Sequence, residues 1–439
     1  MVVSRGKAPT AQETFLQMAQ AAGLRGRLLI TLGLLILVRL GIFIPVPGID
    51  RVAFSRDLAG SGNLGGVIGF LDIFSGGGLS ALGLFALGIL PYINASIIIQ
   101  LLTAALPSLE NLQKNEGEAG RRKIAQITRF VSLGWAVLQS SVIALWVQRY
   151  AQTPGPLFVA GTVIALVAGS MFVMWVSELI TERGVGNGAS LLIFLNITAS
   201  LPKSLQDTIN LAQEGDRSTV AGIVVLLLVF LATIVGIIFV QEGTRRIPIV
   251  SARRQVGRRL YTERSSYLPL RINQGGVMPI IFASAVLVLP YSLANLTQNP
   301  AVAKAAAYLS PNGPTPWLYV LFYLFLIVAF SYFYSSLIVN PADMAQNLKK
   351  MGVSVPGIRP GKATTEYIQG VLNRLTILGA LFLGFVALVP TAVEGAIRVK
   401  TFQGLGATSL LILVGVAIDT AKQIQTYVIS QRYEGMVRQ

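Results

Sequence analysis

The chain has 439 residues, of which 53% are hydrophobic and only 12% are charged, about half of the roughly 25% found in an average soluble domain. Its 35 Lys and Arg outnumber its 19 Asp and Glu, so the formal net charge is +16. Cys and His are both absent, which excludes disulfides, thiolate sites, HExxH zinc chemistry, Ser-His catalysis and histidine proton relays. The composition therefore predicts a polytopic membrane protein. Because the first long apolar run is a full span, we expect no removable signal peptide.

Apolar runs predict ten membrane helices, since a bilayer needs about 20 apolar residues at 1.5 Å each. The fifth run is short and contains Asn196. The predicted ranges are 26–45, 79–105, 124–148, 157–177, 188–201, 219–240, 276–296, 316–339, 372–391 and 404–421.

The stretch from Ser61 to Ala105 is unlike the other spans. From Leu79 onward it carries no charge and predicts a membrane helix interrupted at Pro91. The residues before Leu79, about 62–77, form a short run whose apolar residues recur at helical spacing. The run is bracketed by glycines and is too short to cross a bilayer. One interpretation is a re-entrant half-helix hinged at Gly76–Gly78, which needs protein or a water-filled cavity around it. The other is an amphipathic helix at the membrane interface. The apolar residues of the run are Leu64, Val67, Ile68, Leu71 and Phe74.

The basic residues are distributed unevenly between the two sides that ten spans define. One side takes 26 Lys and Arg and the other takes 8. By the positive-inside rule, this asymmetry predicts that both termini are cytoplasmic. Arg39 lies within the first span, where it either snorkels to the outer interface, the interpretation that we favour slightly, or pairs within the bundle.

Two basic connections follow from this topology. The loop 241–271 contains eight arginines and no lysine, and we expect either a topology determinant or a docking surface for phosphate or carboxylate groups, which a guanidinium binds in bidentate fashion. The loop 341–374 places Arg359 between Pro356-Gly357 and Pro360-Gly361, which indicates either a stiff contact point or a solvated turn. The eight arginines are Arg245, Arg246, Arg253, Arg254, Arg258, Arg259, Arg264 and Arg271.

No nucleotide-binding motif is recognisable in the sequence. The glycines of 184–188 lack the Lys-Ser/Thr of a P-loop and fit a tight turn between two spans. Gly-Ile-Leu-Pro at 88–91 and Gly-Val-Met-Pro at 276–279 occur in the second helices of two sets of five, which weakly indicates an internal duplication. A solute transporter would also have broken spans, but the centres of helices two, seven and ten are mostly aliphatic. An intramembrane enzyme would need paired acids, and Asp419 has no evident partner.

Seven segments, in order along nearly the whole chain, resemble the SecY family, the central subunit of the protein-conducting channel. They are "IPVPGID" at 44–50, "GILPYINASIIIQLL" at 88–102, "GEAGRRKIAQITRF" at 117–130, "WVSELITERGVGNGASLLIF" at 175–194, "RRQVGRRLY" at 253–261, "NLKKMGVSVPGIRPGKAT" at 347–364 and "GATSLLILVGVAID" at 406–419.

The resemblance implies an all-α clamshell of two pseudo-symmetric five-helix halves, 1–201 and 219–439, joined at 202–218. The half-helix 62–77 would be the plug, and 241–274 and 341–371 would be cytoplasmic docking loops. A lateral gate between helices two and seven would use Asn94 and Gln100. An aliphatic pore ring would comprise Ile89, Ile93, Ala189, Ile193, Ile281 and Ile412. Ala189 departs from the family, whose best-known bacterial members carry a bulkier residue there.

The same resemblance implies a passive channel for unfolded secretory polypeptides, with no enzyme activity and no cofactor. Signal peptides and nascent membrane segments would leave through the gate into lipid. SecE and SecG would complete the complex, and the motor ATPase SecA or a translating ribosome would supply the energy and dock on Arg245, Arg246, Arg253, Arg254, Arg258, Arg259 and Arg359. The membrane would be a bacterial plasma membrane or a thylakoid.

Overall fold

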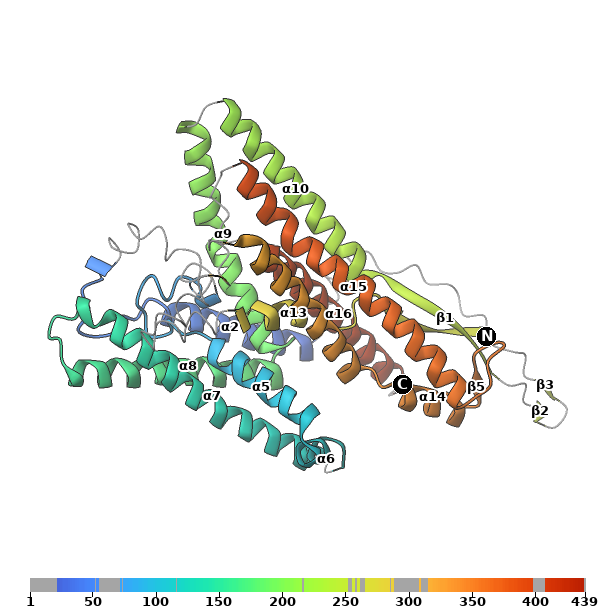
Figure 1. Ribbon diagram of the computed structural model, residues 1–439. Coiled ribbons are helices and arrows are strands. Elements are labelled where there is room, and N and C mark those ends of the chain that lie inside the picture. The colour runs from blue at the N-terminus through green and yellow to red at the C-terminus, as the bar shows by residue number, and fades with distance from the viewer. Residues whose placement is uncertain are drawn as a thin grey trace. The chain divides into compact units, whose positions relative to one another are not determined.

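The computed structural model is predominantly helical (Figure 1). It describes residues 22–51, 53–54, 72, 74–115, 117–214, 217–251, 255–256, 259–260, 265–284, 286–287, 308, 315–397 and 407–437. The long helices are α2 (Ala22–Gly41), α5 (Leu90–Ala105), α7 (Gly117–Val147), α8 (Pro156–Arg183), α9 (Gly188–Glu214), α10 (Arg217–Glu242), α13 (Pro316–Ile338), α15 (Lys362–Ile397) and α16 (Ala407–Val437). Shorter helices are α6 (Pro107–Asn115), η1 (Gln148–Tyr150) and α14 (Pro341–Lys350).

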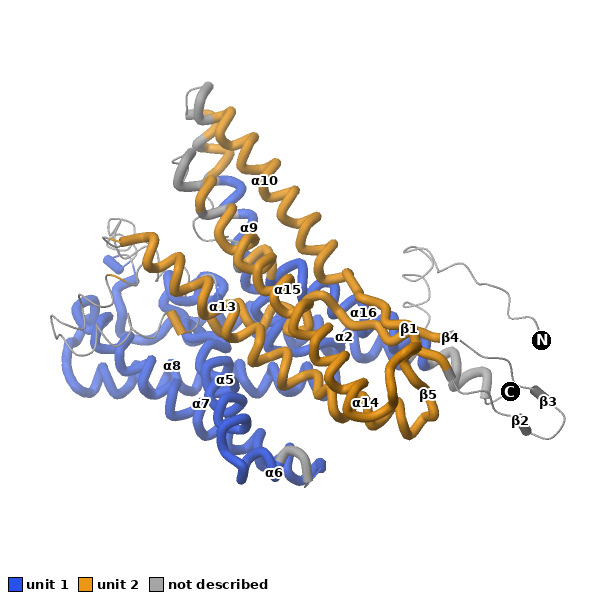
Figure 2. Tube along the Cα trace, turned by 45° about the vertical axis from the view of Figure 1, so that its right-hand side comes forward, with its two compact units in different colours: residues 1–207, 412–439 blue, residues 208–411 orange. Residues whose placement is uncertain are grey.

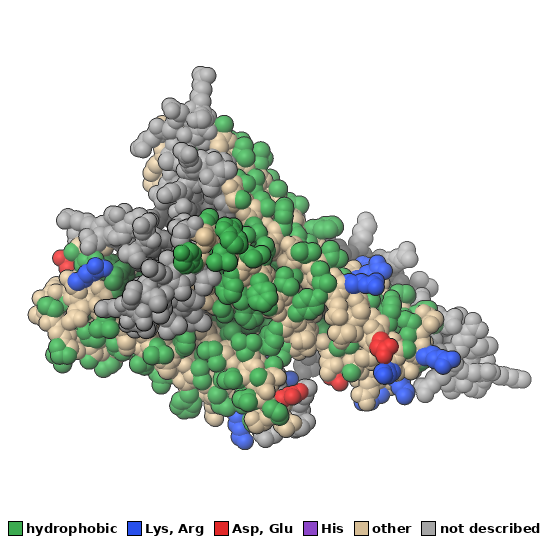
Figure 3. All heavy atoms as spheres, in the orientation of Figure 1, with side chains coloured by type: hydrophobic (Ala, Val, Ile, Leu, Met, Phe, Trp, Pro, Cys, Tyr) green, Lys and Arg blue, Asp and Glu red, His purple; other side chains and the backbone are tan. Residues whose placement is uncertain are grey.

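Six helices in the described part of the chain are long and apolar enough to cross a membrane, and they correspond to all or part of α7, α8, α9, α10, α13 and α15. The remaining predicted spans correspond to α2, to α5, to helical residues 278–284 and to α16. Two of these helices fall outside the six for evident reasons. Helix α2 contains three charged residues, Arg25, Arg27 and Arg39, and α5 has only 16 residues. On the face drawn in Figure 3, hydrophobic side chains predominate among the described residues, as expected of a surface in lipid.

The chain divides into two compact units, residues 1–207 with 412–439 and residues 208–411 (Figure 2). In the first unit, α5 packs on α7, α7 on α8, and α2 on α8. Its core includes Val46, Phe54, Leu82, Val147 and Leu166. The ring of Phe54 meets Trp146 and Tyr150 edge-on, each with 5.3 Å between ring centroids, so the loop after α2 is fixed to the end of α7.

The predicted helix from Leu79 onward is wrong in its first part. Residues 76–89 form consecutive turns, and α5 begins only at Leu90. Gly76, Gly77 and Gly88 have positive φ angles of 68°, 86° and 53°, which a helix does not contain. Pro91 does not interrupt the helix but lies in its first turn, where its missing N–H leaves no hydrogen bond unmade.

The second unit combines helices with a small sheet that the all-α expectation did not include. Helix α15 packs against α10, α13 and α14. The strands β1 (Thr244–Ser251), β4 (Ser265–Arg271) and β5 (Val353–Ser354) form an antiparallel sheet in the order β4-β1-β5, with Ile247 opposite Leu268. A two-stranded ladder pairs β2 (Gln255–Val256) with β3 (Arg259–Leu260). The arginine-rich connection is therefore largely a β-hairpin.

Candidate functional site

The non-helical segment 76–89 is mostly buried and is held from two sides of the first unit. On one side lies the loop after α2: the amide of Leu84 donates to the carbonyl of Ile44 at 2.8 Å, and the amide of Val46 donates to the carbonyl of Leu82 at 3.1 Å. From α8, the buried hydroxyl of Ser170 donates to the carbonyl of Gly88 at 3.1 Å. These contacts pair backbone groups that a helix would otherwise have paired internally.

Three glycines allow the backbones around this segment to approach closely. A Cβ atom at Gly169 of α8 would lie 2.1 Å from the carbonyl oxygen of Leu84, and one at Gly83 would lie 2.1 Å from that of Ile42. A Cβ at Gly41 would overlap the ring of Phe85. The backbone around segment 76–89 is therefore packed so closely that a side chain does not fit at Gly41, Gly83 or Gly169.

The residues just before the segment end in a hydrogen-bonded turn, as the predicted glycine hinge requires. Asp72, Phe74 and Ser75 are helical. The amide of Gly77 donates to the carbonyl of Asp72 at 2.8 Å, and the amide of Ser80 donates to the Asp72 carboxylate at 2.7 Å. The amide of Leu79 donates to the hydroxyl of Ser75 at 3.1 Å. Of the predicted plug residues, Phe74 is 2% exposed, and Leu64, Val67, Ile68 and Leu71 lie outside the described residues.

Arg39 does not follow the snorkelling interpretation. Its guanidinium donates to the carbonyl of Gly76 and lies over the ring of Phe43, 5.6 Å from the ring centroid. The amide of Asn196 on α9 donates to the neighbouring carbonyl of Phe74 at 2.6 Å. Two polar side chains from separate helices therefore meet at the end of the helical residues.

The predicted pore residues are buried, with one exception. Ile89 is fully buried and directly precedes α5, and its carbonyl accepts from the amide of Ile93 at 3.1 Å. Ile193 on α9 and Ile412 on α16 are 2% and 0% exposed, whereas Ala189 is half-buried. These five residues belong to the first unit. Ile281, 5% exposed, belongs to the second.

The predicted gate residues Asn94 and Gln100 lie half-buried on α5. The Gln100 amide donates to the hydroxyl of Ser96 at 3.0 Å, within the same helix, and its Oε1 is buried without a hydrogen-bond partner among the described residues. The proposed bonds of Asn94 and Gln100 across a gate stay predictions.

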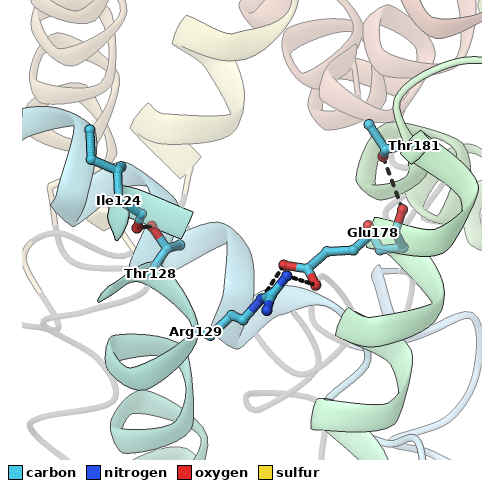
Figure 4. A network of polar contacts seen from close by, with 6 residues as sticks. Ile124, Thr128, Arg129, Glu178 and Thr181 are labelled. Atoms are coloured by element: carbon cyan, nitrogen blue, oxygen red, sulfur yellow. Dashed lines mark hydrogen bonds and ion pairs between the residues drawn. The ribbon is translucent and has the colours of Figure 1, made fainter. Parts of the chain in front are cut away.

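An ion pair that sequence reasoning missed joins α7 to α8 (Figure 4). The Arg129 guanidinium on α7 contacts both carboxylate oxygens of Glu178 on α8, each at 2.9 Å. A bidentate pair of this kind fixes orientation as well as distance. The segments "GRRKIAQITRF" and "SELITER" carry the two charges, but their pairing across 49 residues left no signal in a single sequence.

The two predicted docking loops pack on one core within the second unit. Ile247 and Leu270 of the hairpin and Val355 of the second loop cluster with Ile368 and Leu372 of α15. Arg245 and Arg246 are exposed, and the Arg246 guanidinium lies 4.9 Å from the ring centroid of Tyr267. Arg259 lies in β3, and Arg253, Arg254 and Arg258 lie outside the described residues.

Arg359 is exposed and follows a tight turn. The amide of Ile358 donates to the carbonyl of Val355 at 3.1 Å, and Gly357 has a φ of 78°, the pattern of a type II turn with Pro356 in second position. The Arg359 carbonyl accepts from the hydroxyl of Thr364 at 2.9 Å. The backbone that presents this arginine is therefore fixed.

Comparison with known proteins connects these features to one family. The SecY family model matches residues 83–421, and the protein translocase subunit SecY of Synechococcus elongatus is 82% identical over 438 residues, covering 100% of both chains. The chain belongs to the SecY family. Among solved structures, the fold matches that of a SecY whose plug domain is described as stabilising the closed state of the translocation channel, with TM-score 0.66, 18% identity and 92% of both chains covered. It also matches Sec61 in a canine ribosome-channel complex, with TM-score 0.61, 17% identity and 92% of both chains covered. The SecY-type membrane fold expected from the motifs is confirmed.

Replacing Gly169 by Ala should lower stability by about 1–3 kcal/mol, since the added methyl group overlaps the Leu84 carbonyl and forces α8 away from segment 76–89. Thermal unfolding of the detergent-solubilised protein measures the loss. Gly161→Ala is the matched control, because it lies in the same helix and a Cβ there meets nothing within 4 Å. Equal melting temperatures for the two variants would contradict the tight packing at Gly169.

Proposed function

We propose that this chain is the pore-forming subunit of a protein translocation channel. It conducts unfolded secretory polypeptides across a membrane and releases hydrophobic segments sideways into lipid. The observation that carries the proposal is the 82% identity over the full length to a protein translocase subunit SecY. The buried, non-helical segment that ends at Ile89 supports it, because irregular backbone among membrane helices marks a functional site.

We propose that the six side chains Ile89, Ile93, Ala189, Ile193, Ile281 and Ile412 form the constriction, with the plug of 62–77 on its outer side. In hydrocarbon, the peptide groups of an unfolded chain have no hydrogen-bond partners, and each unpaired group costs several kcal/mol. The chain therefore needs an aqueous path. A ring of aliphatic side chains offers no ligands for a dehydrated ion and can dewet. It also forms no specific hydrogen bonds, so it accepts chains of any sequence. The burial of the five isoleucines supports the assignment.

The exit into lipid would run along α5, with Asn94 and Gln100 at the gate. A polar group that has no hydrogen-bond partner between apolar helices favours any arrangement of those helices that gives it one. The buried Oε1 of Gln100 is such a group. Both termini would be cytoplasmic, as the charge asymmetry predicts. The membrane would be a plasma membrane or a thylakoid, in keeping with the cyanobacterial relative.

The energy source would be external, from the SecA motor or from a translating ribosome, and SecE and SecG would be the companion subunits. The arginines that would dock the motor or the ribosome are Arg245, Arg246, Arg253, Arg254, Arg258, Arg259 and Arg359. The hairpin and the loop that carries Arg359 pack on the same apolar core, to which Ile247 and Val355 both belong. This shared core supports a single docking surface. The solved complex of Sec61 with a ribosome shows such an assembly for a protein of the same fold.

The proposal predicts polypeptide transport by a reconstituted complex. Proteoliposomes with the chain, its two small partner subunits and the motor should protect a secretory precursor from external protease when ATP is present. A precursor without its signal peptide should stay digestible. If the folded complex protected no precursor, the hypothesis of a small-solute transporter would have to be reopened.

Reversing the charge of the docking arginines should weaken ribosome binding. The triple variant Arg245→Glu, Arg246→Glu and Arg359→Glu should bind ribosomes about tenfold more weakly at low salt, and the difference should shrink as salt screens the charges. Co-sedimentation with ribosomes measures it. Arg149→Glu is the control, because Arg149 is predicted on the opposite side of the membrane. Equal binding by the triple variant and the control would refute the docking assignment.

A further inference from the structure

The helical residues 278–284 of the second unit carry Ile281, the one member of the proposed constriction that lies outside the first unit. Ile281 is 5% exposed, and its chain neighbours Ile280 and Phe282 are 0% and 1% exposed. Because the positions on either side of Ile281 are buried as well, their contacts determine the place and the direction of its side chain.

Phe282 packs this helical segment against α13. Its ring lies between those of Phe330 and Tyr334, which are one turn apart on α13. It meets both of them edge-on, with 5.8 Å and 5.5 Å between ring centroids. Aromatic rings prefer this arrangement, because the positive edge of one ring meets the negative face of another. A smaller or non-aromatic side chain at position 282 would lose both contacts.

A second contact between the segment and α13 is polar. The hydroxyl of Ser284 lies 3.4 Å from the hydroxyl of Tyr323, and both side chains are buried. The single proton of the Ser284 hydroxyl is donated to the carbonyl of Ile280 at 2.8 Å, so Tyr323 is the donor to Ser284. The distance is long for an O–H···O hydrogen bond, and its contribution is therefore smaller than that of the aromatic contacts.

Together the two contacts fix the rotation of the segment about its axis. Successive residues of an α-helix are about 100° apart, so Phe282 and Ser284 leave the axis about 200° apart, with Ala283 midway between them. Ile281 leaves the axis on the opposite side, about 160° from Ala283. A rotation that brought Phe282 closer to α13 would move Ser284 away from it.

Contacts at the start of the segment indicate which side faces α13. A Cβ atom at Gly275 would lie 2.8 Å from Pro279 Cγ and 3.5 Å from Tyr334 Cβ, so Pro279 lies close to α13. Pro279 and Ala283 are one turn apart and share a face of the helix. The face that contains Ala283, which is small and fully buried, is therefore the one toward α13, and Ile281 lies on the other face.

We propose that Phe282 and Tyr323 are positioning residues for Ile281. They hold the segment 278–284 on α13 with Ala283 toward that helix, so that Ile281 is turned to meet the polypeptide path. Without them the segment rotates and Ile281 leaves the path. The inference rests on the proposed function, because it assumes that Ile281 belongs to the constriction. Phe282 and Tyr323 orient Ile281 and do not contact the transported chain.

The absence of cysteine allows a direct test. A photo-crosslinker is attached at Ile281→Cys or, in a separate protein, at Ile89→Cys, and a secretory precursor is arrested halfway through the reconstituted membranes. The measured quantity is the ratio of the crosslink yield at position 281 to that at position 89. Phe282→Ala should lower this ratio about fivefold, the effect of losing a favourable aromatic pair. Tyr323→Phe should lower it about twofold, because only a weak hydrogen bond is lost.

Phe325→Ala is the matched control, because Phe325 lies on the same helix and its side chain is 65% exposed. It should leave the ratio unchanged. Tyr323→Phe and Ser284→Ala remove the same hydrogen bond, so the double variant should lower the ratio no further than either single variant. A general loss of folded protein would lower the yields at both positions and leave the ratio unchanged, which separates positioning from a merely structural role.

An unchanged ratio in Phe282→Ala would overturn the proposal, and so would an equal fall in Phe325→Ala. If Phe282→Ala does not fold, Phe282→Leu, which keeps an apolar side chain but removes the ring, and Tyr323→Phe decide by the same ratio.

The outcome is separable from the proposed function. A parent protein that crosslinks at both positions, with ratios that the variants leave unchanged, would reject the positioning role alone. Parent membranes that translocate precursor without a crosslink at either position would reject the constriction itself.

Discussion

The pairing of backbone groups in the segment between α2 and α5 is the constraint on which the rest of the first unit depends. Residues 76–89 leave the helical hydrogen-bond pattern while remaining mostly buried, so each N–H and C=O needs another partner. The partners come from the loop after α2, from Ser170 on α8 and from local turns. Ile89, at the end of the segment, is consequently held at a fixed place before the first turn of α5.

Small residues allow that arrangement, and they explain why α8 contributes so much to it. Gly169 brings the α8 backbone against Leu84, and the next residue, Ser170, bonds to Gly88. Membrane helices pack closely through such residues, because apolar side chains gain little by leaving lipid for protein. In the second unit, the hairpin and the proline-rich loop lie outside the predicted spans. Both are fixed by packing on one apolar core with α15.

Much of this could be predicted from the sequence, because hydropathy and glycine act locally. The apolar runs located the six described helices that are long enough to cross a membrane, the glycines of 76–78 predicted a turn where positive φ angles are found, and the ordered motifs indicated the family. The start of α5 at Leu90 was missed because an uncharged run is equally compatible with a helix and with buried turns. The hairpin was missed although Ile247 and Ile249 alternate with the exposed Arg246 and Pro248, since the arginines were interpreted only as a topology determinant or a docking surface.

Contacts that depend on tertiary structure were beyond such reasoning. For Arg39 the sequence left snorkelling and pairing within the bundle both open, and it could not identify the acceptor, the carbonyl of Gly76, 37 residues away. The Arg129–Glu178 pair and the neighbourhood of Asn196 likewise join separate helices, and no local pattern in one sequence specifies which helices meet.

Site-specific crosslinking of a stalled precursor tests the central claim most directly. A photo-crosslinker attached at Ile89→Cys should react with a secretory chain arrested halfway through reconstituted membranes. The same reagent at Leu228→Cys, on the 61% exposed side chain of α10, should not. Membranes that translocate the precursor without any crosslink from position 89 would contradict the placement of the polypeptide path at the end of segment 76–89.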